Sequence, residues 1–566
     1  MKVVTPQNNH LTKIAMLTCG FFIATSFCAL QLNAQQHSWV VDSAINVIDG
    51  WGPVYNKVQP GDTVYLKAGN RDKLLIRNFT GAADSPVIFM NKGGVVTIST
   101  NGYYGVSVNN CRYARFTGQG NSSDVYGVQI KKVAAGCGVG IGALSSDIEI
   151  DHVSIENCST EGIFAKTDPD CSLKTTRDKF TQFNTSIHDN YIANVGNEGM
   201  YIGSSNYAGV TITCNGKDTV LMPPVLDGIK VYNNRVRNTG WDGIQVSSAP
   251  LHCYIFNNTV LNDSQAEVPN QMSGIIMGGG SKCDCNNNLI SNGKGDGIEN
   301  HGLGGNRIFN NIIVNAGQTY LPNDATQMKH GILVSDVSEV KDSAVCLFFN
   351  DIINPKSDGI RFQSVKSKHN LISYNLIVNP GNYNLYELGN TAFTGKDAYV
   401  MIPNGTADIQ LKNNYFSRSI TAAGISATDY TILPGSPLIN QGYADNGAIT
   451  FDFNNHKRPV GGLYDIGAME YAGGADTLLH TFSDKPLLFP NPVNTTLSIK
   501  YLSAAVTKTI LHIYALSGQQ VLQQYNQVIA TGIQELHVAV DALPCGLYIY
   551  SIQNGTVITY GKFIKS

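Results

Sequence analysis

The sequence predicts an all-β protein in which a right-handed parallel β-helix solenoid is followed by a small antiparallel β-sandwich. Three observations support this: a degenerate repeat of short apolar strands, 57 glycines among 566 residues, and a change of pattern near residue 485. Glycine and asparagine favour tight turns, and a hydrophobic content of 43% is sufficient for a large core.

Each copy of the repeat has two halves. Residues 231–238 illustrate the first half, an apolar strand followed by Asn-Asn, an apolar pair and another asparagine. Residues 242–246 illustrate the second half, an acidic or polar residue followed by glycine and a short β-branched strand. The matching glycines lie 23 to 44 residues apart, which is typical of a solenoid whose insertions leave from fixed corners. They are Gly162, Gly199, Gly243, Gly274, Gly297, Gly331 and Gly359.

We expect the glycine after each corner to adopt a positive φ angle. We also expect the last asparagine of each copy to bond to its equivalent one rung away, forming a ladder that satisfies buried backbone groups. This structural role is favoured over a catalytic one. The candidates are Asn157, Asn194, Asn238, Asn292, Asn315 and Asn354.

Residues 104–378 resemble the right-handed parallel β-helix superfamily of pectate lyases, polygalacturonases and chondroitinase-B-like enzymes. The segments at 60–66 (PGDTVYL) and 85–89 (SPVIF) resemble the opening turns of bacterial extracellular members. The segments at 436–439 (SPLI) and 465–470 (DIGAME) resemble a closing segment, which we expect to cover the last rung. The predicted parts are a cap with the first turns at 35–103, the solenoid at 104–400 and the closing segment at 401–471.

The N-terminus is predicted to be an export signal covering residues 1–34. Lys2 and Lys13 precede an apolar stretch at 14–30, and Ala34 provides a small residue before the expected cleavage site. Polar residues interrupt the stretch too often for a membrane anchor, and no later segment is apolar enough to span a bilayer.

The pattern changes after a predicted linker at 472–484. The segment at 485–566 contains LFPNPV at 488–493, LPCGLYIY at 543–550 and GKFIK at 561–565, with alternating strands between turns. It resembles the C-terminal sorting domain of the type IX secretion system of Bacteroidota, and an immunoglobulin-like carbohydrate-binding module is the alternative. The resemblance implies the type IX secretion machinery as a partner, and a secreted or outer-membrane surface location.

Ten cysteines remain after the predicted signal. Most of them fall on strands, where a free buried thiol is expected. Cys253 and Cys283 occupy the same place in consecutive repeats and should stack. Cys171 and Cys214 lie in polar insertions after neighbouring repeats and could form a disulfide.

Candidate functional residues lie just before the repeat glycines, where copies one rung apart are separated by about 4.8 Å. Charged residues make up only 14% of the chain and the net charge is −3, which does not indicate a nucleic-acid or anionic-lipid partner. Sugar chemistry needs two carboxylates for hydrolysis, or a base and a cation for elimination from a uronic acid. The column reads Glu161, Glu198, Asp242, Ser273, Asp296, His330 and Asp358.

We therefore predict an extracellular polysaccharide as the partner. The predicted catalytic residues are Asp296, Glu299, His301, His330 and Arg361. The predicted substrate-binding residues are Tyr201, Trp241 and Lys329, and the predicted ligands of a possible calcium cofactor are Glu161, Glu198 and Asp242.

Several interpretations stay open at this stage. His330-Gly331 followed by Arg361 resembles the polygalacturonase pattern, but Lys329 and Gln363 depart from it and paired aspartates are missing. A lyase would use Lys329, His330 or Arg361 as base or charge stabiliser. Aspartate before glycine is also a common turn pair, so a non-catalytic glycan-binding or adhesion protein is the alternative. Two loops, 168–183 and 215–225, could form walls of a cleft.

Overall fold

The computed structural model describes residues 38–120, 124–320, 328–381, 399–403, 407–442, 449–460, 462–471, 487–489, 493–503, 507–515, 518–529, 532–554 and 557–565. The predicted signal peptide at 1–34 and the predicted linker at 472–484 lie outside these ranges.

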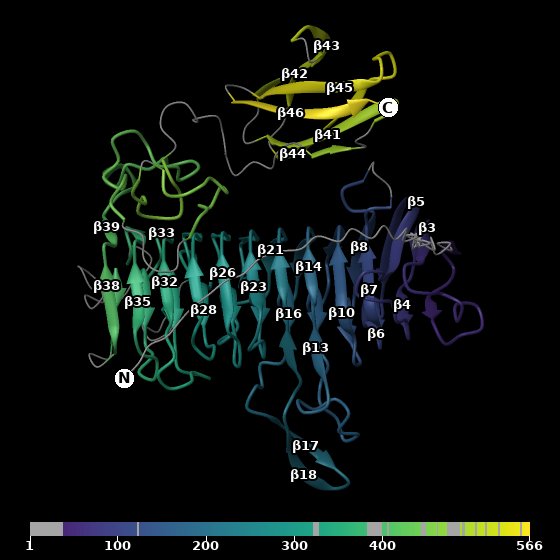
Figure 1. Ribbon diagram of the computed structural model, residues 1–566, viewed down its shortest axis with the longest axis horizontal. Helices are drawn as coiled ribbons and strands as arrows, with labels where there is room; N and C mark the ends of the chain where they lie inside the picture. The colour runs from purple at the N-terminus through teal and green to yellow at the C-terminus, as the bar shows by residue number, and fades with distance from the viewer. Residues whose placement is uncertain are drawn as a thin grey trace, which may run out of the picture. The chain divides into compact units, whose positions relative to one another are not determined.

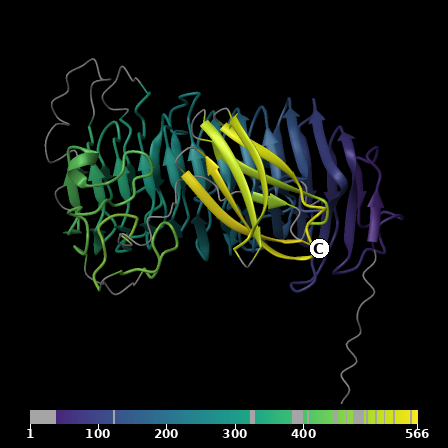
Figure 2. The ribbon, with the colours of Figure 1, turned by 90° about the horizontal axis from the view of Figure 1, so that it is seen from above.

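A parallel β-helix forms the main part of the described chain, as the sequence predicts. Most coils contribute two strands to a 23-stranded sheet and one strand to a 12-stranded sheet, and all pairings in both sheets are parallel. Figures 1 and 2 show successive coils side by side, from purple at the first strands to green at the last.

The 12-stranded sheet consists of β2 (Val47–Asp49), β4 (Leu74–Arg77), β6 (Tyr104–Asn109), β9 (Cys137–Gly142), β12 (Ile163–Ala165), β16 (Met200–Ile202), β22 (Ile244–Val246), β25 (Ser273–Met277), β28 (Asp296–Asn300), β31 (Ile332–Val334), β34 (Ile360–Phe362) and β37 (Val400–Met401). The 23-stranded sheet consists of β1 (Ser38–Val41), β3 (Thr63–Arg71), β5 (Val87–Thr100), β7 (Arg112–Thr117), β8 (Val128–Val133), β10 (Ser146–Asp151), β11 (Val153–Glu156), β14 (Ser186–His188), β15 (Tyr191–Val195), β20 (Lys230–Tyr232), β21 (Arg235–Thr239), β23 (Cys253–Phe256), β24 (Thr259–Leu261), β26 (Cys283–Asn286), β27 (Leu289–Ser291), β29 (Arg307–Phe309), β30 (Ile312–Val314), β32 (Cys346–Phe348), β33 (Asp351–Ile353), β35 (Asn370–Ser373), β36 (Leu376–Val378), β38 (Ile409–Lys412) and β39 (Tyr415–Ser417).

Columns of aliphatic side chains from equivalent positions on successive coils fill the interior. In the 12-stranded sheet, Ile244, Ile275, Ile298, Ile332 and Ile360 pair in register, and all five are fully buried. Because side chains alternate between the two faces of a strand, the residue after each of these points outward. The outward residues of this sheet therefore form a second column on its outer face, where Gln245 and Ile276 are themselves covered and the others are partly exposed.

The repeat glycines have a different role from the predicted one. None of the seven has a positive φ angle. A Cβ on Gly297 would lie 2.4 Å from Cγ2 of Ile313 and 2.5 Å from the carbonyl oxygen of Gly331, and the other six glycines meet similar contacts. Glycine is needed because the backbone passes too close to the aliphatic column of the other sheet. Asparagine, not glycine, adopts the positive φ angles at the corners.

The predicted asparagine ladder is present, but it lies at the surface. Asn238 donates from Nδ2 to Oδ1 of Asn194 over 2.9 Å, and Asn315 donates to Asn292 over 2.8 Å. Asn157 donates instead to the carbonyl oxygen of Lys131. These side chains are exposed or half-buried, so the prediction that they satisfy buried backbone groups is wrong.

A second ladder, which the sequence analysis missed, is inside the solenoid. Asn258 donates from Nδ2 to Oδ1 of Asn288 over 3.0 Å, and to the carbonyl oxygen of Val231 over 2.8 Å. The backbone N–H of Asn258 also donates to Oδ1 of Asn288. This ladder uses the second residue of each corner pair, which is Asn-Asn in five copies and follows Asp189, Phe349 or Tyr374 in the others: Asn190, Asn234, Asn258, Asn288, Asn311, Asn350, Asn375 and Asn414.

We expect Asn288→Ala to lower the free energy of unfolding by about 1–3 kcal/mol, because it leaves buried backbone partners unsatisfied. Asn315→Ala removes a surface ladder amide that water can replace, and should cost clearly less. Urea denaturation of both variants followed by circular dichroism measures the difference. Equal losses would mean that burial does not distinguish the two ladders.

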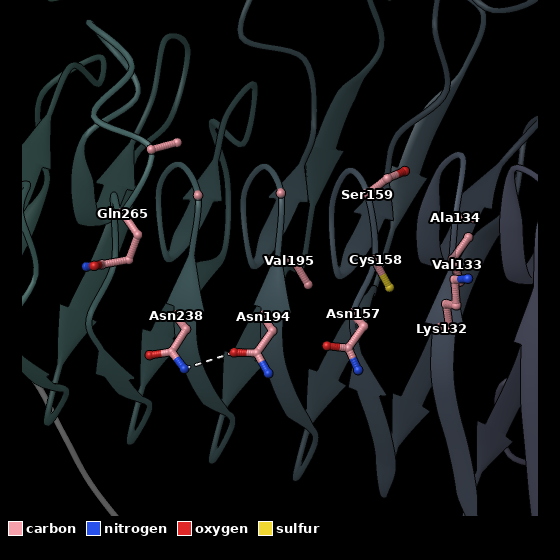
Figure 3. Close-up of a pocket in the computed structure, with 13 residues that line it drawn as sticks. Lys132, Val133, Ala134, Asn157, Cys158, Ser159, Asn194, Val195, Asn238 and Gln265 are labelled. Carbon is pink, nitrogen blue, oxygen red and sulfur yellow. Dashed lines mark hydrogen bonds between the residues drawn. The ribbon is translucent and has the colours of Figure 1, made fainter.

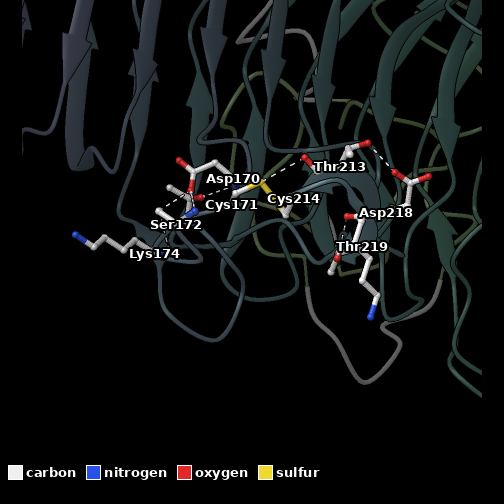
Figure 4. Close-up of a disulfide and its surroundings, with 10 residues drawn as sticks. Asp170, Cys171, Ser172, Lys174, Thr213, Cys214, Asp218 and Thr219 are labelled. Atoms are coloured by element: carbon white, nitrogen blue, oxygen red, sulfur yellow. Dashed lines mark hydrogen bonds between the residues drawn. A yellow bond between two sulfur atoms is a disulfide. The ribbon is translucent and has the colours of Figure 1, made fainter.

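Two insertions on neighbouring coils are joined by a disulfide. The loop after β12 carries Cys171, and the loop after β16 carries Cys214 at the end of the hairpin formed by β17 (Val210–Cys214) and β18 (Lys217–Leu221). Figure 4 shows the bridge between the two loops. The predicted bond is therefore present. The strands β13 (Thr181–Phe183) and β19 (Val225–Asp227) pair in parallel where the insertions return to the solenoid.

Cys253 and Cys283 stack in register on neighbouring strands, as predicted, but they are not free thiols. They form a second disulfide, since their Cα atoms lie 4.5 Å apart, within disulfide reach. Cys285, two residues along the same strand, is a free buried thiol whose pKa is raised by burial.

The closing segment lies against the side of the solenoid and does not only cover its last rung. It contacts the corner residues of four successive coils: Asn287, Asn310, Phe349 and Tyr374. Arg458, fully buried, pairs with Glu470 over 2.9 Å and donates to Oδ1 of Asn310 over 2.8 Å. The short helix α1 (Ile420–Ala423) follows β39, with Ser419 as its N-cap.

The C-terminal part is antiparallel, as predicted. One sheet contains β40 (Leu487–Phe489), β41 (Thr496–Ser503) and β44 (Gly532–Ala539). The other contains β43 (Gln520–Ile529), β42 (Thr507–Ala515), β45 (Gly546–Asn554) and β46 (Val557–Lys565). Their apolar faces share one buried cluster that includes Leu497, Ile513 and Phe563.

Candidate functional site

The outward column of the 12-stranded sheet carries three of the predicted functional side chains, Tyr201, Glu299 and Arg361. Pairing in register gives this outer column the order Phe164, Tyr201, Gln245, Ile276, Glu299, Leu333 and Arg361. Neighbouring rungs are about 4.8 Å apart, so Glu299 and Arg361 are separated by about 10 Å along the sheet. Tyr201 precedes Glu299 by three rungs.

Asp296 and Lys329 form a buried ion pair at the start of this site. Nζ of Lys329 lies 3.1 Å from Oδ2 of Asp296, and Oδ1 of Asp296 accepts from the backbone N–H of His330. Burial raises the pKa of Asp296, and the charge of Glu299 adds to this effect while Lys329 opposes it. Burial disfavours the Lys329 cation, but Asp296 and Glu299 outweigh it and raise the lysine pKa.

Glu299 and His301 form a second pair, on the outward side of β28. Nε2 of His301 lies 3.1 Å from Oε2 of Glu299, and the imidazole keeps 25% of its side-chain surface exposed. Burial disfavours the charged imidazole, but the hydrogen bond to Glu299 and its charge raise the pKa of His301 above its usual value. Burial acts against the Glu299 carboxylate, but His301 and Lys329 hold its pKa below the ordinary range.

His330 and Arg361 both contact Asp358. Nδ1 of His330 lies 3.2 Å from Oδ2 of Asp358, and Nη1 of Arg361 lies 3.0 Å from the same oxygen. The His330 side chain is only 4% exposed, whereas Arg361 is 17% exposed and belongs to the outer column. His330 is therefore placed to support Arg361 through Asp358, and the guanidinium is the group nearer to solvent.

The predicted sugar-stacking residues are not together. Tyr201 belongs to the outer column, where Nζ of Lys166 lies 4.8 Å from its ring centroid and its hydroxyl bonds to Ser205. Trp241 is half-buried at a corner, where its carbonyl oxygen accepts from Thr239. The sequence analysis missed Lys166, because a single lysine after a strand carries no recognisable pattern.

The predicted calcium ligands follow one another on consecutive rungs. Glu161 accepts from Asn197 over 3.1 Å, while Glu198 and Asp242 are buried. Burial raises the pKa of Glu198 to about 7. Burial, with the charges of Glu299 and Glu198, raises the pKa of Asp242 well above its usual value. Calcium at these three residues stays a prediction.

One compact group of potential metal ligands was missed. Glu149, Asp151 and His188, on the outside of the 23-stranded sheet, have ligand atoms within 4.8 Å of one another, and no other such group occurs in the described part of the chain. Arg115 pairs with Glu149 over 3.0 Å and with Asp151 over 2.7 Å. Burial disfavours the His188 cation, but hydrogen bonds to Asp189 and Glu149 raise its pKa to about 9. In this structure the three side chains are held by ion pairs with Arg115 and between His188 and Glu149.

One predicted loop forms part of a wall beside the outer column. The segment after β16 places Tyr207 against the turn after β25, where a Cβ on Gly280 would lie 2.0 Å from the tyrosine ring. Arg177, from the loop after β12, lies 4.1 Å from the Tyr207 ring centroid. Ser338 accepts from the backbone N–H of Gly280 and donates to the carbonyl oxygen of His301. These contacts connect both insertions to the neighbourhood of His301.

Comparison with known families gives one match, to the secretion system C-terminal sorting domain, over residues 487–566. These residues are a type IX sorting domain. The sorting domain assigns the chain to secretion or to the outer-membrane surface. In the described residues, no helix has both the length and the apolar character needed to cross a membrane.

Solved structures similar to this chain include three polysaccharide-modifying proteins. Pectate lyase Pel9A is 12% identical, with a TM-score of 0.42, and the match covers 76% of this chain and 96% of that one. Alginate lyase from Paenibacillus sp. str. FPU-7 is 16% identical, with a TM-score of 0.37, covering 54% and 93%. The A-module of mannuronan C-5 epimerase AlgE6 from Azotobacter vinelandii is 11% identical, with a TM-score of 0.35, covering 68% and 92%. No curated protein matches the sequence.

Proposed function

We propose that this secreted solenoid cleaves an extracellular uronic-acid polysaccharide by β-elimination at the outer column. The observation that carries the proposal is the placement of His301, paired with Glu299, two rungs from the Arg361 guanidinium. Elimination needs a base near C5 of the sugar and a cation that stabilises charge on the carboxylate.

Each residue has a distinct role in this proposal. Neutral His301 removes the C5 proton, the C5–H electrons form the C4–C5 double bond, the C4–oxygen bond to the leaving sugar breaks, and that oxygen takes up a proton from water. Glu299 orients the imidazole and stabilises its protonated form. Arg361 pairs with the substrate carboxylate, and Asp358 holds Arg361 with support from His330. Lys329 keeps Asp296 neutralised and adds positive charge.

Hydrolysis is supported less well by the same side chains. It requires two carboxyl groups that reach the glycosidic bond from either side, about 5–9.5 Å apart. Glu299 belongs to the outer column, but Asp296 is 1% exposed and fully engaged by Lys329 and His330. Asp242, whose carboxyl also interacts with Glu299, is fully buried, so among the described residues neither Asp242 nor Asp296 is exposed to activate a water beside Glu299.

Calcium is not assigned a step in the reaction. Glu161 already accepts from Asn197, and the three predicted ligands are not among the described groups whose ligand atoms lie within 4.8 Å of one another.

Glycan binding without catalysis is the second candidate. It is favoured by the ion pairs themselves, because Asp296–Lys329 and Asp358–Arg361 also stabilise the corners of a solenoid. An adhesion protein would need no titratable group at the surface, whereas His301 stays partly exposed.

A substrate screen tests the proposed function. Purified protein should generate unsaturated ends, seen by ultraviolet absorbance, from alginate, polygalacturonate or a glycosaminoglycan. Reducing sugar that appears without this absorbance would indicate hydrolysis instead. Absence of both signals, with retained binding to one of the polymers, would support the binding protein.

A further inference from the structure

A shallow groove of about 670 Å³ lies on a different surface from the outer column. It follows the corners after β8, β11, β15, β21 and β24, over five neighbouring coils. Figure 3 shows Asn157, Asn194 and Asn238 in one row along it, with Gln265 at one end and Lys132 at the other.

The row of amides in this groove is incomplete. Nδ2 of Asn238 donates to Oδ1 of Asn194 over 2.9 Å, but within residues 124–320 no hydrogen bond joins the amides of Asn194 and Asn157. An amide N–H of Asn194 and the amide oxygen of Asn157 therefore face the groove one rung apart, on exposed side chains. Both have φ angles in the left-handed region, 57° and 54°, which directs them away from the strands.

The surrounding residues leave room for an extended ligand. Gly196 and Gly240 contribute only backbone to the lining, and Ala134 and Ala266 are small and exposed. No carboxylate lines the groove, and Lys132 is its one cation. Neutral and acidic sugars are therefore both compatible with it.

We propose that this corner groove binds a single extended polysaccharide chain, parallel to the solenoid axis and separate from the outer column. Coils repeat every 4.8 Å or so, which is close to the length of one pyranose unit in a β-1,4-linked chain. Each sugar therefore meets the same corner geometry as its neighbour. Amides provide the paired donors and acceptors that vicinal hydroxyl groups require.

The test uses full-length protein carrying His301→Gln and Arg361→Ala, so that turnover does not interfere. Binding is measured by affinity electrophoresis with alginate, polygalacturonate and hydroxyethyl cellulose. We expect at least one polymer to bind. Ala134→Trp, which fills the groove without touching the ladder, should weaken this binding about tenfold or more, whereas Ala135→Trp should not. Ala135 is the neighbouring exposed alanine and does not line the groove.

A second pair of variants separates recognition from folding. Asn194→Ala and Asn315→Ala each remove one amide of the surface ladder, but only Asn194 lines the groove. Weaker binding for Asn194→Ala alone supports the groove. The proposal is overturned if none of the three polymers binds, or if the members of each pair bind alike. The binding result does not depend on the proposed elimination activity, because binding is measured in a protein that lacks the proposed base His301.

Discussion

Replacement of His301 by glutamine is expected to lower the turnover of a uronic-acid polymer by about 100-fold or more, with little change in melting temperature. Glutamine keeps a hydrogen-bond donor toward Glu299 but cannot accept a proton. Initial rates from ultraviolet absorbance and a thermal melt measure both quantities. His369→Gln is the matched control, because that imidazole is 87% exposed and far along the chain from the site. Similar rates for both variants would exclude His301 as the base.

The pH dependence provides a sharper form of the same prediction. Because the hydrogen bond to Glu299 and its charge outweigh burial and raise the pKa of His301 above 6.5, turnover should increase as pH rises through this raised pKa. Glu299→Gln removes the hydrogen bond and the charge that cause the shift. The rising limb should then move to lower pH, even if the maximal rate falls. If the rising part of the pH–rate profile does not move, the titrating group is not His301.

Replacement of Gly297 by alanine is expected to lower the free energy of unfolding by about 3 kcal/mol or more. The new methyl group would lie 2.4 Å from Cγ2 of Ile313 and 2.5 Å from a carbonyl oxygen, and backbone cannot move aside without disturbing two coils. Urea denaturation followed by circular dichroism measures the loss.

Gly140→Ala is the control for this effect. Gly140 belongs to the same sheet, but a Cβ there meets nothing closer than 3.6 Å and its φ angle is not left-handed. The loss should therefore be small. Comparable destabilisation by both substitutions would mean that backbone entropy, and not steric contact, explains the repeat glycines.

The sequence predicted the coils because insertions leave only from corners, so the core of each repeat stays recognisable despite variable spacing. Local pattern could not decide which asparagine of a corner faces inward. Asn288 and Asn292 look equivalent in the sequence, yet one is fully buried and the other exposed. A shift of one position along a turn reverses the direction of a side chain. The amino-acid composition of the corner does not reveal which direction each asparagine takes.

The sequence predicted which residues belong to the candidate site, but it did not predict how exposed each side chain is. Polar residues before glycine were expected at the surface, whereas Asp242, Asp296 and His330 are all buried. At this corner these side chains are covered and do not reach the surface. Pairing between Asp358 and Arg361, three residues apart, was visible only once the strand direction was known. Contacts of the closing segment join residues more than 140 positions apart, beyond any local pattern.

The buried Arg458 has a consequence for a force applied along the chain. A pulling force on the sorting domain would reach the solenoid through the closing segment, which precedes that domain in the sequence. That segment is fastened by Arg458 to Asn310, three coils before the last one, and by Asp452 to Asn287. The force would then act first on interior coils of the solenoid, at Asn310 and Asn287. The last coils would be held by these contacts and would not unfold one at a time from the end.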